Sequence, residues 1–136
     1  MTIELLDIPG LRAEEQTRWQ VRALAFDGQS PALVTLRQWQ QTEFTDFKKI
    51  MKVMRIVGGM HRVPDENKVK RGENPAHGEV YEMRAHKGHA RLMFFYSERD
   101  DAAVVVCTND YWKGKGSQDA AFARCAKLKQ LYELQL

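Results

Sequence analysis

The stretch that decides the fold runs from residue 79 to residue 115 and reads EVYEMRAHKGHARLMFFYSERDDAAVVVCTNDYWKGK. It contains three apolar runs, which we predict to be strands, over Glu79–Ala85, Ala90–Ser97 and Ala102–Thr108. The two connections are short and polar, which favours a meander of antiparallel strands over parallel crossovers. The run Ala102–Cys107 is apolar on both faces, a pattern typical of a buried central strand.

Upstream of this stretch, the sequence predicts one more strand and two helices. The alternation of Trp19–Phe26 is that of a strand with one buried face. A first helix is expected over residues 30–41, since serine is a preferred N-cap and proline fits the first helical position. A second helix is expected from about residue 43 to residue 57, where Gly58-Gly59 would end it in the left-handed conformation.

The remaining segments are a polar connection and a C-terminal helix. The second helix carries one apolar stripe, which we expect to be core: Phe44, Phe47, Ile50, Met51 and Met54. Residues 60–77 are polar and are expected to form a surface loop with a turn near Val69. The last helix should begin near Ser117 and bury one side, formed by Ala121, Cys125, Leu128 and Tyr132.

The order of these elements is β-α-α-β-β-β-α, which predicts an α+β fold. We expect a small antiparallel sheet with the helices packed on one face. A chain of 136 residues fits one domain, and residues 1–17 are interpreted as an N-terminal extension of it.

Composition limits the class of protein and its partners. Lys and Arg total 21 against 18 acidic residues, a net charge of +3 that permits a nucleic-acid partner without requiring one. No apolar run is long enough to span a membrane, and the acidic N-terminus does not favour a signal peptide. The two cysteines, Cys107 and Cys125, fall in apolar positions and are expected to be buried thiols of a cytoplasmic protein.

Cationic and aromatic residues gather at the ends of the predicted strands. Alternation places Glu82 and Arg84 on the face opposite Tyr81, and Arg91 begins the next strand at the edge of that open face. Such a face can bind phosphate through arginine and stack bases on aromatic rings, or it can simply be a solvated surface. Further candidate contacts with RNA lie in the connections: Lys68, Lys70, Arg71, Lys87, His89, Lys113 and Lys115.

Other chemistries have weaker support in the sequence. The pair His86 and His89 lacks a third metal ligand nearby, so we expect no metal and no cofactor. Gly114-Lys115-Gly116 lacks the spacing of a phosphate-binding loop.

The sequence resembles the RelE/ParE toxin superfamily, most closely the phage-derived group near the HigB toxins. The resemblance lies in GEVYEMR (78–84), KGHARLMFFY (87–96), the apolar strand, YWKGK (111–115), and DGQSPAL (27–33) before a helix pair. It covers about residues 18–132. Two positions depart from relatives: Trp112 replaces a histidine of some HigB toxins, and Glu82 replaces a lysine of ribosome-dependent RelE enzymes.

The resemblance implies a toxin of a type II toxin–antitoxin pair that cuts mRNA on the ribosome and is neutralised by a helix-turn-helix antitoxin. It assigns catalytic roles to Arg84, Arg91, Asp110 and Tyr111, with His86 or His89 as further candidates for proton transfer. Asp110 and Tyr111 are expected just beyond the end of the third strand. Two alternatives stay open, namely a non-enzymatic module that binds a protein such as gyrase and an inactive phage-derived remnant.

Overall fold

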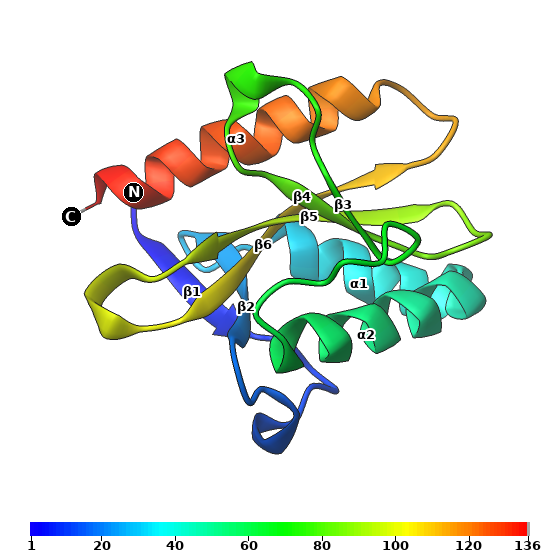
Figure 1. Cartoon of the computed structure of the whole chain (residues 1–136), viewed down its shortest axis with the longest axis horizontal. Helices are drawn as coiled ribbons and strands as arrows, with labels where there is room; N and C mark the ends of the chain where they lie inside the picture. The colour runs from blue at the N-terminus through cyan, green and yellow to red at the C-terminus, as the bar shows by residue number, and fades with distance from the viewer. Residues whose placement is uncertain (136) are drawn as a thin grey trace.

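The computed structural model describes residues 1–135 and contains one six-stranded sheet between helices (Figure 1). The strands are β1 (Ile3–Asp7), β2 (Gln20–Phe26), β3 (Val69–Arg71), β4 (Tyr81–Arg84), β5 (Ala90–Ser97) and β6 (Val104–Trp112). The helices are α1 (Pro31–Thr42), α2 (Phe44–Gly59) and α3 (Gln118–Leu134), and no helix of the described residues is long and apolar enough to cross a membrane. The predicted α+β class is confirmed.

The sheet is mixed, which corrects the expectation of an antiparallel one. Its order is β1-β2-β6-β5-β4-β3, and the predicted meander of β4, β5 and β6 is antiparallel. Strand β2 pairs with β6 in parallel, from Gln20 opposite Val104 to Ala23 opposite Cys107. These two strands are far apart in the chain, so no turn between them could indicate the pairing.

Helices cover both faces of the sheet, and the prediction of one covered face is therefore wrong. Figure 1 shows α1 and α2 on one side of the sheet and α3 on the other. Strands β5 and β6 are buried on both faces, with Phe94 and Val105 packed toward α1 and α2 and with Phe95 and Val106 packed toward α3. A strand that is apolar on both faces needs cover on both, because exposing either face costs hydrophobic free energy.

Two segments that were interpreted as extension and loop contain edge strands. Residues Ile3–Asp7 form β1, which pairs antiparallel with β2 from Ile3 opposite Phe26 to Asp7 opposite Arg22. Within the predicted surface loop, Val69–Arg71 forms β3 at the other edge and pairs with β4. Strands of three to five residues carry too little periodicity to be recognised in the sequence.

The second helix is longer than predicted, and its buried residues lie further toward its C-terminal end. Helix α2 continues through Gly58 and Gly59, neither of which adopts a positive φ, so there is no left-handed stop there. A Cβ on Gly58 would lie 3.4 Å from a side-chain carbon of Val21. The carbonyl of Gly58 accepts hydrogen bonds from the backbone nitrogens of Arg18 and Trp19. Phe44, expected in the core, is 55% exposed because it begins the helix at its outer end.

Strand β6 is longer than predicted and contains a β-bulge. Leu92 lies opposite Asp110 and Phe94 lies opposite Cys107, so Thr108 and Asn109 together oppose Met93. The extra residue changes the alternation of every side chain beyond it. Asp110 and Tyr111 thus lie within the strand and on opposite faces of the sheet, which corrects the expectation that they lie beyond it.

Candidate nucleic-acid interface

A hollow of about 560 Å³ lies where the β4–β5 turn meets the connection between β6 and α3. We call it the first hollow, and its lining residues are Asn67, Arg84, His86, Lys87, Gly88, His89, Arg91, Lys113 and Gly114. Four of these residues are arginines or lysines and none is acidic. A concave surface with one sign of charge concentrates anions, so this hollow is suited to a phosphate-bearing ligand.

The β4–β5 turn is held in place by helix α2. The Asp46 carboxylate accepts hydrogen bonds from the backbone nitrogens of His89, at 2.7 Å, and Ala90, at 2.9 Å. Lys49 donates from Nζ to the backbone carbonyl of His86 at 3.0 Å. A Cβ on Gly88 would lie 2.5 Å from Asp46 Oδ1, so the approach requires glycine. The turn is therefore fixed before any ligand binds.

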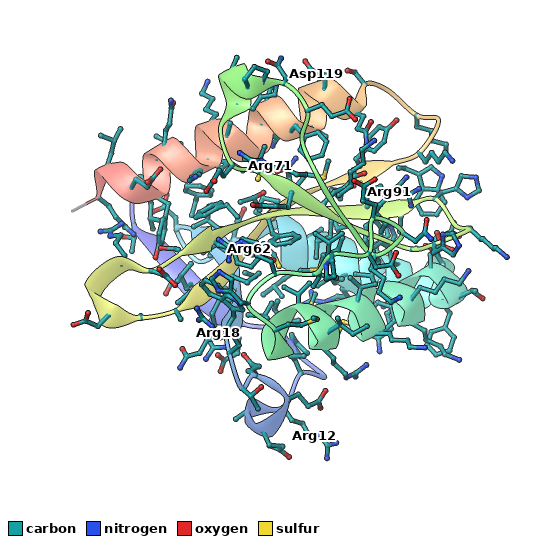
Figure 2. All side chains as sticks on the ribbon, viewed as in Figure 1. Arg12, Arg18, Arg62, Arg71, Arg91 and Asp119 are labelled. Carbon is teal, nitrogen blue, oxygen red and sulfur yellow. The ribbon has the colours of Figure 1, made fainter. Side chains whose placement is uncertain are left out.

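Arg91 lines the first hollow but is only 4% exposed, which corrects its expected place on an open face. Its Nη1 atom donates to three backbone carbonyls, those of Ala90 at 2.9 Å and of Ala85 and Gly88 at 3.3 Å. Burial, together with the neighbouring charge of Arg84, lowers the pKa of Arg91. Arg91 thus supports the turn as well as lining the hollow. Figure 2 labels its position on the ribbon.

Arg84 lies on the same face of the sheet as Arg91, and two residues hold its guanidinium. Its Nη1 atom donates to the carbonyl of Glu66 at 3.0 Å, and its Nε lies 3.5 Å from Oε1 of Glu82. Its Nη2 atom donates to no protein acceptor within residues 1–135. Arg84 therefore has an oriented guanidinium with donor capacity left for a ligand.

Glu82 lies beneath this site and is fully buried, although the sequence placed it on an open face. Gln118, the first residue of α3, donates to Glu82 Oε1 at 2.8 Å, while Oε2 has no partner. Burial raises the pKa of the Glu82 carboxyl, against the opposing charges of Arg84 and Arg91. Helix α3 covers this part of the face, so Glu82 supports Arg84 without reaching the hollow.

One lining residue of the first hollow, His89, is held by aromatic packing. The His89 ring stacks on Trp112, with ring centroids 5.4 Å apart and planes 11° from parallel, and Trp112 packs in turn against Trp39. The backbone nitrogen of Lys113 donates to the carbonyl of His89 at 2.9 Å, which joins the β4–β5 turn to the end of β6. Tyr111 lies opposite Arg91 in the sheet register but does not line the hollow.

Several predicted site residues lie elsewhere. Asp110 is on the α1 face, where its Oδ1 accepts a hydrogen bond from Thr35 at 2.8 Å, so the β-bulge separates it from the arginines. Lys70 and Arg71 pair with Glu73 and Glu79 and line a smaller hollow at the start of α3. Lys115 is exposed in the connection between β6 and α3. Lys68 pairs with Asp65 at 2.7 Å outside the first hollow.

The structure adds residues that sequence reasoning missed. Asp46 and Lys49 hold the turn, Asn67 lines the hollow, and Gln118 binds Glu82. Asp46 and Lys49 look like ordinary polar positions of an amphipathic helix, and only the fold reveals their partners. No group of three or more His, Cys, Asp or Glu within the described residues is placed to hold a metal ion.

Neither the protein-family models nor the curated proteins and solved structures with which the chain was compared match it. The resemblance to the RelE/ParE toxins therefore remains a prediction from the sequence.

Proposed function

We propose that this protein binds single-stranded RNA in the first hollow and cleaves it without a metal ion. The observation that supports this is the gathering of Arg84, Lys87, Arg91 and Lys113 around one hollow without an acidic lining residue. RNA phosphates supply the matching charge, and the rings of His86 and His89, which line the hollow, can stack on the bases of an unpaired strand. We propose further that the chain is a RelE-like, HigB-like toxin acting on ribosome-bound mRNA, with a helix-turn-helix antitoxin as its partner.

The proposed reaction needs two proton transfers and one anion-binding group. The ribose 2′-hydroxyl attacks the adjacent phosphorus, loses its proton to a base, and displaces the 5′-oxygen, which takes a proton from an acid. The products are a 2′,3′-cyclic phosphate and a 5′-hydroxyl. His86 and His89 both line the first hollow, and imidazole is suited to both proton transfers near neutral pH.

The arginines have different roles in this proposal. Arg84 retains free donors and would stabilise the negative charge that develops on the phosphoryl oxygens. Arg91 uses Nη1 to support the turn, so its contribution combines charge with positioning. Lys87 and Lys113 would hold flanking phosphates. Asp110 and Lys115 have no place in this set because they lie outside the hollow.

Binding and cleavage of a labelled single-stranded RNA test the proposal. Arg84→Ala should weaken binding and lower the cleavage rate on the order of 100-fold, the usual effect of losing one donor to a developing oxyanion. Lys127→Ala is the matched control, since it removes one cation from the exposed side of α3, and it should behave as wild type. Cleavage should persist in EDTA and yield the cyclic phosphate.

Induction in a bacterium separates the toxin proposal from its alternatives. The wild-type chain should arrest growth, an antitoxin should restore it, and primer extension should reveal cut mRNA. Growth arrest without RNA cleavage would indicate a toxin that binds a protein such as gyrase. Normal growth with soluble, folded protein that does not bind RNA would indicate an inactive remnant and refute the proposal.

A further inference from the structure

A second hollow of about 420 Å³ adjoins the first hollow. The two share four lining residues, Asn67, Arg84, His86 and Lys87, so they form neighbouring compartments of one surface. The other residues that line the second hollow come from α2 and from the segment before β3: Lys49, Lys52, Val53, Ile56, Asp65 and Lys68. Its ligand would therefore lie next to whatever occupies the first hollow.

The second hollow combines an apolar patch with cations. Val53, which is 6% exposed, and Ile56 supply the apolar part from one side of α2. Lys49 and Lys52 stand on the same side of this helix at a spacing of three residues. A nucleotide has these same two parts, because its base is flat and largely apolar on its faces while its phosphate is anionic.

The acidic lining residue of the second hollow does not cancel this charge. Asp65 accepts from Lys68 Nζ at 2.7 Å and from the backbone nitrogen of Asn67 at 2.9 Å. These contacts lower the pKa of Asp65 and occupy its carboxylate oxygens. Lys49, Lys52, Arg84 and Lys87 thus leave the second hollow cationic.

Arg84 lies in the shared part of the two hollows. Its guanidinium is fixed by Glu66 and Glu82, so it can meet a phosphate that links nucleotides in the two compartments. Lys49 Nζ donates one of its three N–H groups to the carbonyl of His86, and two N–H groups remain for a ligand.

From this arrangement we infer a second nucleotide-binding subsite in the hollow formed by α2 and the segment before β3. The base of the neighbouring nucleotide packs on Val53 and Ile56, and its phosphate binds Lys52 and Lys49. The ligand is consequently an RNA strand of at least two nucleotides rather than a mononucleotide. This inference rests on the proposed function, since it extends the strand held in the first hollow.

Binding of fluorescein-labelled hexauridylate, measured by anisotropy over a range of salt concentrations, tests the inference. Lys52→Ala should weaken binding and reduce the salt slope by about 0.7, the value for one lost phosphate contact on a single strand. Ile56→Asn should weaken binding without changing the salt slope, because it removes apolar contact and no charge. Lys48→Ala is the matched control, since this exposed lysine lies on the same helix over Phe44 and lines neither hollow.

The outcomes distinguish the two proposals. If Lys52→Ala and Ile56→Asn bind as wild type while Arg84→Ala binds weakly, the second subsite is refuted and the first hollow remains. Equal weakening by Lys52→Ala and Lys48→Ala would also refute it, because only net charge would then matter. If Arg84→Ala also binds as wild type, the proposed function itself fails. Thermal melts of each variant establish that the protein measured is folded.

Discussion

At the scale of single residues, Glu82 is an unusual group for a strand interior. It is a fully buried carboxyl in the middle of the short strand β4, and one of its oxygens has no partner. Gln118 and Arg84 satisfy the other oxygen. Burying a charge costs free energy that neighbouring cations must offset, and here burial outweighs them, since the pKa of Glu82 is raised.

The raised pKa predicts the pH dependence of a Glu82→Gln variant. The folded protein binds the proton of Glu82 more tightly than the unfolded chain, whose carboxyl titrates near the ordinary value of 4.5. The unfavourable contribution of Glu82 is therefore absent below that pH and grows as the pH rises through the folded pKa. Glu82→Gln should melt at a higher temperature than wild type at pH 8, and this difference should shrink toward pH 4.

The control for this prediction is Glu73→Gln, which changes an exposed carboxyl that pairs with Lys70. Its melting temperature should follow that of wild type at both pH values. A Glu82→Gln protein less stable than wild type at pH 8 would contradict the prediction. It would mean that the attraction of Glu82 to Arg84, Arg91 and Lys70 exceeds the cost of burial.

At the scale of elements, helix α2 holds the β4–β5 turn, and residues of this turn line both hollows. Asp46 binds two backbone nitrogens of the turn, and Lys49 binds one of its carbonyls. The β4–β5 turn carries the side chains of His86, Lys87 and His89. Charge-assisted hydrogen bonds to backbone groups are among the stronger ones, so α2 restricts where these three side chains can lie.

An Asp46→Ala variant should loosen the turn. It leaves the backbone nitrogens of His89 and Ala90 without the carboxylate acceptor, at a cost of about 2 kcal/mol for hydrogen bonds to a charged group. Hydrogen exchange at these two amides should accelerate, while exchange in β6 should change less. Asp46→Asn, which keeps one acceptor oxygen, should lie between Asp46→Ala and wild type.

A double-mutant cycle with Gly88→Ala checks the same contact independently. The added Cβ would lie 2.5 Å from Asp46 Oδ1, so Gly88→Ala should destabilise the wild-type protein. In the Asp46→Ala background that clash is absent, and the same substitution should cost less. Additive effects of the two changes on the free energy of unfolding would show that the carboxylate and Gly88 do not interact.

At the scale of the whole molecule, local patterns predicted the elements better than their arrangement. The strand Ala90–Ser97 was predicted with the bounds that the structure has, and Ser117 caps α3 as expected, because an apolar run and a capping serine are features of neighbouring residues. The parallel pairing of β2 with β6 and the placement of α3 opposite α1 and α2 depend on segments far apart in the chain.

In the candidate site, too, the local features were predicted better than the long-range ones. Arg84, Lys87, His89 and Arg91 were predicted together because they flank one turn, where proximity in sequence ensures proximity in space. Asp110 lies apart from the arginines because a single extra residue in β6 turns it to the other face, and no composition signal marks that bulge. The contribution of α2 to the site could be recognised only from the folded structure.

Deletion of residues 1–10 tests whether the N-terminal segment belongs to the fold. The segment supplies β1, which pairs along β2 from Arg22 to Phe26, and Ile8, which is 4% exposed in the core. Its loss would remove buried apolar side chains and expose the edge of β2, so we expect a destabilisation of about 3 kcal/mol or more. The melting temperature should fall by about 10 °C, and the protein should aggregate more readily.

The matched control is Glu4→Ala, a change at an exposed position of the same strand, which should leave the melting temperature nearly unchanged. RNA binding should survive the deletion below the new melting temperature, because β1 lies at the opposite edge of the sheet from β3 and β4 and lines neither hollow. An unchanged melting temperature would show that residues 1–10 are a dispensable extension. Loss of RNA binding by folded, truncated protein would instead place part of the ligand against β1 and move the interface across the sheet.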